Sequence, residues 1–156
     1  MQKITPFLWF ESRAEEAVEF YTAIFNNSRV VKMRRAPEGG PAPAGSVLGI
    51  DFQLEGQDFV AINGGPQFQF TPAISLFVSC KDQAEVDRLW ARLTEGGEEL
   101  PCGWLTDRFG VSWQIIPEVL GERMFDPDPA RAGNVMQAMM QMKKIDIAAI
   151  EAAYAG

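Results

Sequence analysis

The chain has 156 residues, 47% of them hydrophobic, so it is long and apolar enough to fold around a core of its own. Its formal net charge of −7 disfavours polyanionic partners, and we expect it to bind neither nucleic acid nor a membrane surface. It contains no histidine, which excludes a Ser-His-Asp triad and every metal site built on imidazole.

The start of the chain and its cysteines indicate a cytoplasmic protein. The first residues, MQKITPFLWF, are too polar for a signal peptide, and no apolar run is long enough to cross a bilayer. Cys80 and Cys102 do not form a disulfide framework. We expect both thiols to be buried or half-buried. Some activation of Cys80 stays open, because it lies beside Lys81 and just ahead of a predicted helix.

The first half of the chain reads as a strand, a helix and three strands. Residues 4–10 form an apolar and aromatic strand, and Ser12 with Glu15 forms a capping box that predicts a helix start. Apolar residues then recur at helical spacing as far as Phe25. Three strand-like runs follow, RVVKMRR, SVLGIDFQL and DFVAIN. The Pro- and Gly-rich segment APEGGPAPAG between the first two predicts a surface loop.

The second half repeats this order, which predicts two βαβββ modules within a single domain of residues 1–156. ISLFVSC is a strand, Asp82 with Glu85 predicts the next helix start, and short strands follow in EEL, GWLT and VSWQII. Module one spans about 1–66 and module two about 73–118. A helical tail spans about 127–155, with methionines at helical spacing that we expect to pack in a core or subunit contact, and with Asp146 as a helix cap.

Four segments carry a resemblance to a known superfamily: ITPFLWFESRAEEAVEFY, SCKDQAEVDRLW, CGWLTDRFGVSWQIIP and VMQAMMQMKKIDIAAIEAAY. They resemble the vicinal oxygen chelate superfamily, which includes glyoxalase I, extradiol dioxygenases and bleomycin resistance proteins. Within it they are most similar to the PhnB-like branch labelled as 3-demethylubiquinone-9 3-methyltransferase domains. The resemblance implies an α+β fold in which two βαβββ modules form curved mixed sheets around a cleft, with C-terminal helices added. It also implies a homodimer.

The resemblance places the metal ligands of relatives near Pro6, Ala73, Gln114 and the segment VAIN, where Asn63 is the polar candidate. Pro6 and Ala73 cannot ligate a metal through their side chains, and the neutral amide of Gln114 is a weak ligand for a divalent transition metal. We therefore expect no metal and no other cofactor. The methyltransferase label is also in doubt, because the first strand-to-helix turn, FESRAEE, lacks the glycines of a nucleotide-binding turn.

Alternation along the last strand predicts that Gln114 and Ser112 face the cleft while Trp113 packs against a helix. Ser75 is a candidate hydrogen-bond partner for Gln114, and Trp104 is the best aromatic candidate for a cleft wall. The stretch TDRFG predicts a β-turn rather than a catalytic acid–base pair. Its Asp107 and Arg108 are candidates to line the cleft mouth. The predicted ligand-binding residues are Gln114, Ser112, Ser75, Asn63, Trp104, Asp107 and Arg108.

Three functions stay open from the sequence. The first is a metal-free protein that binds a small apolar or aromatic molecule in the cleft. The second is a metal-dependent lyase, isomerase or oxygenase of the same superfamily with unusual carboxylate ligands. The third is a dimeric interaction protein, without a small-molecule ligand, that uses the Met-rich tail and the QFQF loop as its interface.

Overall fold

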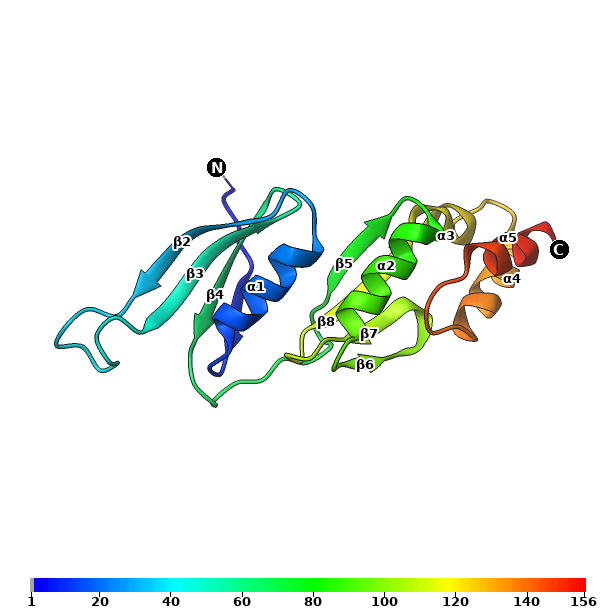
Figure 1. Cartoon of the computed structure of the whole chain (residues 1–156). Helices are drawn as coiled ribbons and strands as arrows, with labels where there is room; N and C mark the ends of the chain where they lie inside the picture. Colours follow the sequence, from blue (N-terminus) through cyan, green and yellow to red (C-terminus); the bar gives the residue numbers. More distant parts are fainter. Residues whose placement is uncertain (1) are drawn as a thin grey trace. The chain divides into compact units, whose positions relative to one another are not determined.

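The computed structural model describes residues 2–156. The chain divides into two compact units, Met1–Phe70 and Thr71–Gly156. Each unit contains a four-stranded sheet with a helix against one of its faces, and the C-terminal helices belong to the second unit (Figure 1). The α+β fold with two mixed sheets is therefore confirmed.

The first unit has the strand order β1-β4-β3-β2, in which only β1 and β4 run parallel. Its elements are β1 (Phe7–Phe10), α1 (Ala14–Ile24), β2 (Arg29–Arg35), β3 (Val47–Leu54) and β4 (Gln57–Asn63). Helix α1 buries Val18, Tyr21 and Ile24, and β3 contributes the buried Ile50 and Phe52. The core of this unit thus lies between α1 and one face of the sheet.

The start of α1 differs from the prediction. The helix begins at Ala14, and its cap position, Arg13, makes no side-chain capping hydrogen bond, so the proposed Ser12 cap is wrong. Asn63 at the end of β4 caps the helix instead: its Oδ1 accepts a hydrogen bond from the Ala14 backbone N–H at 2.9 Å. Its Nδ2 donates to Glu15 Oε1 at 2.8 Å. A residue distant in sequence therefore satisfies the first turn of the helix.

The second unit repeats the topology with the order β5-β8-β7-β6, and only β5 and β8 run parallel. Asp82 caps α2 as predicted, since its Oδ1 accepts from the Glu85 backbone N–H at 2.9 Å. The elements are β5 (Leu76–Cys80), α2 (Gln83–Thr94), β6 (Glu98–Glu99), a 3-10 turn η1 (Pro101–Gly103), β7 (Trp104–Thr106) and β8 (Ser112–Pro117).

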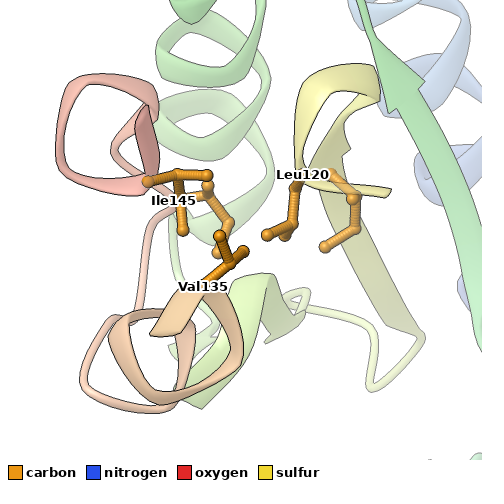
Figure 2. Packing of buried hydrophobic residues seen from close by; sticks show 5 residues of the cluster. Leu120, Val135 and Ile145 are labelled. Carbon is orange, nitrogen blue, oxygen red and sulfur yellow. The ribbon is translucent and has the colours of Figure 1, made fainter. Parts of the chain in front are cut away.

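Three helices follow β8: α3 (Glu118–Met124), α4 (Pro129–Met140) and α5 (Ile147–Ala155). Helix α3 was not predicted, whereas the Asp146 cap of α5 is confirmed by its hydrogen bond from the Ala149 N–H. The three helices share a buried cluster with the end of β8 (Figure 2), formed by Ile116, Leu120, Val135, Ile145 and Ile150. Met139 and Met142 pack against it, as expected of the methionines. Within residues 2–156, no helix has the length and apolar character needed to cross a membrane.

Candidate functional site

The strand register of the second sheet decides which side chains share its uncovered face. Phe77 on β5 and Trp104 on β7 are the Cα partners of Gln114 on β8, so the three side chains form one row across the sheet. Trp113 and Ile115 point the other way, where α2 packs, and both are buried as predicted for Trp113. Phe77 is 59% exposed. We call the side of a sheet opposite its α1 or α2 helix the open face.

The polar groups on this face include one hydrogen-bonded pair and one buried hydroxyl. Gln114 Nε2 donates to Ser75 Oγ at 3.0 Å, the partner that the sequence had suggested. Ser112 lies two residues earlier on the same face and is buried. Its Oγ has no hydrogen-bond partner among residues 2–156. A buried hydroxyl without a partner costs about 1–3 kcal/mol, so Ser112 would gain from a ligand or water that bonds to it.

The tail borders this face at the C-terminal end of β8. Ile116 shares the face with Gln114, and its side chain belongs to the buried cluster of the tail helices. The tail is held there by backbone hydrogen bonds from Cys102 to Met142 and from Gly103 to Lys143, both 2.8 Å. The sequence analysis did not predict that the tail packs against the end of β8. The helical spacing of the methionines was the one signal that the tail packs against something.

The predicted turn at Asp107 is confirmed. Its carboxylate accepts hydrogen bonds from the backbone N–H groups of Phe109 and Val111 at 2.8 and 3.1 Å, and from Trp113 Nε1 at 2.8 Å. The side chain is buried, and Arg108 Nη2 lies 3.3 Å from Glu95 Oε2. These contacts give both residues structural roles. Asn63 likewise has a structural role, as the cap of α1. Ligand binding by Asp107, Arg108 and Asn63 therefore stays a prediction.

The residues in this row do not fit a metal site. Phe77, rather than Ala73, lies opposite Gln114 on β5, and its counterpart in the first sheet is Phe7 opposite Val60 on β4. Pro6 and Ala73 both precede their strands. Within the described part of the chain, no group of three or more Cys, Asp or Glu residues could hold a metal ion. Aromatic side chains and the neutral amide of Gln114 therefore form this row, and they are weak ligands for a divalent transition metal.

The thiol of Cys80 is not activated. Cys80 is fully buried, and burial, with a smaller contribution from Glu85, raises the pKa of its thiol to about 12. The suggested activation by Lys81 and the helix start is therefore wrong, because desolvation of the thiolate outweighs it. Cys102 is half-buried and adopts a positive φ of 64° in η1. Its position in that turn indicates a structural role.

The open face of the first sheet carries Phe7 and Trp9. Phe7 is 62% exposed. The Trp9 ring lies across Gly64, where an added Cβ would come within 2.3 Å of a ring atom. Its Nε1 donates to the Gly65 carbonyl at 2.9 Å, and Phe68 of the QFQF loop meets the ring edge-on at 5.0 Å between centroids. Gly64 therefore lets the indole lie flat on this face.

The model of the 3-demethylubiquinone-9 3-methyltransferase family matches residues 2–116. The chain belongs to this family. The match ends at Ile116, so the three tail helices lie outside it. No curated protein matches the sequence.

Solved structures agree with the family. A PhnB protein from Bacillus cereus, which carries the same methyltransferase description, is 41% identical, with 74% of this chain and 99% of that chain covered and a TM-score of 0.69. A protein from Pseudomonas aeruginosa is 23% identical, with coverage of 76% and 98% and a TM-score of 0.64. A fosfomycin resistance protein from Listeria monocytogenes is 16% identical, with coverage of 79% and 98% and a TM-score of 0.55. The last two likenesses show the shared fold.

The family description names a methyl transfer, but this family member does not have the doubly wound fold of a Rossmann-like methyltransferase. Each sheet contains one parallel strand pair, not the run of parallel strands of that fold. The turns that lead from β1 into α1 and from β5 into α2 contain no glycine, so neither is the glycine-rich turn of such a fold.

Proposed function

We propose that the protein is a metal-free, cytoplasmic, small-molecule-binding member of the glyoxalase and bleomycin resistance superfamily. It holds a compact apolar or aromatic ligand on the open face of the second sheet. The observation that carries the proposal is the uncovered row of Phe77, Gln114 and Trp104. Aromatic side chains supply most of the contact area of such a site, and a few fixed polar groups orient the ligand.

The polar groups of the row suit binding better than chemistry. Gln114 donates one amide N–H to Ser75. Its second N–H and its carbonyl oxygen can bond to a ligand. The buried hydroxyl of Ser112 offers a further donor and acceptor. Neither an amide nor an ordinary hydroxyl takes a proton near neutral pH, so these groups position a ligand and do not act as a general base.

The test is a thermal-shift screen with a library of neutral aromatic compounds, on protein purified without chelator or added metal. We expect hits that stabilise the wild type to bind at least about tenfold more weakly to Phe77→Ser, because burial of an aromatic contact is worth about 1.5–3 kcal/mol. Phe125→Ser is the matched control, since Phe125 is 85% exposed in the second unit, between α3 and α4. Hits that bind Phe77→Ser as well as they bind the wild type would refute the site.

Elemental analysis of the same preparation tests the metal-free part of the proposal. We expect no retained manganese, nickel, zinc or iron, because the row offers no charged ligand. One equivalent of metal per chain would overturn this and favour the metal-dependent enzyme.

A further inference from the structure

Strand β2 is an edge strand with a high density of positive charge. All seven of its residues are exposed, and it is the outermost strand of the first sheet. It carries four of the fourteen basic residues in a chain whose net charge is −7: Arg29, Lys32, Arg34 and Arg35. Such a concentration of one sign in an acidic protein needs an explanation beyond solubility.

One irregularity in the strand register brings three of these four side chains to one face. In a regular strand, residue 29 would face one side and residues 32 and 34 the other. The register of β2 against β3 shifts between Val30 and Lys32, so Val31 is an extra residue, and Arg29, Lys32 and Arg34 lie opposite Gln53, Asp51 and Gly49, alternate residues of β3 that share a face. Arg35 lies on the other face, where its Nη2 contacts Met33 Sδ at 3.3 Å.

This face is the open face of the first sheet. The register connects Lys32 to Asp51, Asp51 to Val60 and Val60 to Phe7, so one row crosses all four strands. Neighbouring strands lie about 4.8 Å apart, which puts Lys32 and Phe7 roughly 14 Å from each other along the row. The row has a basic end and an exposed aromatic end, and Asp51 and Val60 lie between them. Its length suits a molecule of two or three rings.

Two of the three cations on this face are not neutralised. Arg34 pairs with both oxygens of Asp51, at 3.1 and 2.7 Å. Arg29 donates to the neutral Gln53 Oε1. Within residues 2–156, no carboxylate lies within ion-pair distance of Arg29 or Lys32. An anionic group at this edge would therefore meet uncompensated positive charge.

We propose that the open face of the first sheet binds a soluble organic anion, with its aromatic or apolar body against Phe7 and Val60 and its carboxylate, sulfonate or phosphate at the basic edge. An acidic peptide added as a further strand fits less well, because the bulge at Val31 disrupts the outer edge of β2. An anionic membrane fits less well because the chain as a whole would be repelled. This inference goes beyond the proposed function and rests on the first sheet alone.

The experiment compares two dyes with the same rings, anilinonaphthalene sulfonate and the neutral phenylnaphthylamine, by fluorescence titration of the full chain. We expect the sulfonate to bind more tightly, and its affinity to fall as salt is added. The double variant R29Q/K32Q should weaken sulfonate binding about fivefold, since each exposed charge pair contributes a factor of about two to three. Binding of the neutral dye should not change. The control K81Q/R92Q makes the same charge change in the second unit and should leave both affinities as they are.

A gain of sulfonate affinity without a gain for the neutral dye completes the test, because partial unfolding would expose apolar surface and raise the binding of both dyes. Asp51→Asn removes one acidic group from the face and releases Arg34, so sulfonate binding should tighten about twofold to threefold. Equal affinity for the two dyes, or no effect of the double variant, would overturn the anion site while leaving the second-sheet proposal intact. Loss of both dyes in Phe77→Ser but not in Phe7→Ser would also overturn it. Sedimentation with phosphatidylglycerol vesicles that depends on Arg29 and Lys32 would replace the soluble anion with a membrane surface.

Discussion

At the residue scale, the Asp107 carboxylate is a buried acceptor of three hydrogen bonds. It holds the turn before β8 together through two backbone N–H groups and the indole N–H of Trp113, and it is 3% exposed. We expect Asp107→Ala to lower the free energy of unfolding by about 1–3 kcal/mol, because it leaves buried donors without an acceptor. Urea denaturation measures this. The exposed Glu98→Gln serves as control and should stay within about 0.5 kcal/mol of the wild type.

The same residue shows which contacts a sequence can predict. The turn at Asp107 and the caps at Asp82 and Asp146 were predictable, since each partner lies within six residues along the chain. The cap of α1 was not, because Asn63 reaches Ala14 across 49 positions. Ser12 gave a plausible local signal that a tertiary contact overrode. Local hydrogen bonds can thus be inferred from residue type and spacing, and distant ones need the fold.

At the scale of elements, the tail is part of the second unit. Gln83 on α2 donates to the Ile145 carbonyl at 2.9 Å and accepts from the Ile147 N–H at 2.7 Å. Asp87, one turn later, accepts hydrogen bonds from Gln83 and from Lys144, and these hold the pKa of its carboxyl below the usual value. The cluster around Ile116 adds apolar contact with β8 (Figure 2). These connections from two elements should make the tail unfold together with the sheet.

We therefore expect Ile145→Ala to destabilise the whole second unit by about 2–5 kcal/mol, as is usual when a fully buried aliphatic side chain is truncated. Hydrogen exchange should show faster exchange of β5 and β8 amides as well as tail amides. Met136→Ala, on the exposed side of α4, is the control and should have little effect. Faster exchange confined to residues 118–156 would mean that the tail opens on its own.

Strands were predictable as elements, but their faces were not. Alternation correctly separated Gln114 from Trp113 on β8, a regular strand. The same reasoning applied to RVVKMRR would put Arg29 on one face and Lys32 on the other, because nothing in the sequence marks the register shift after Val30. The proposed anion site depends on that shift, so it could not be inferred from the sequence.

At the scale of the whole molecule, the repeated topology was predictable from the repeated order of capping signals and strand-like runs. A further property follows from the exposed apolar side chains. Large hydrophobic residues are exposed in both units. They include Ile4, Phe7, Phe68, Ile74, Phe77, Phe125 and Met140. Pairing of two copies of the chain would cover part of this surface.

We accordingly propose a homodimer and expect light scattering to give twice the mass of one chain at micromolar concentration. Two variants locate the interface: Phe68→Ser in the QFQF loop, and Phe125→Ser with Met140→Ser in the tail. Each replaces strongly exposed apolar side chains, so its effect on folding should be small and its effect on association large. The variant at the interface should shift the mass toward the monomer at the lowest concentrations, because loss of apolar contact raises the dissociation constant. A wild-type protein that stays monomeric at all concentrations would refute the dimer and leave both open faces accessible to ligands in the single chain.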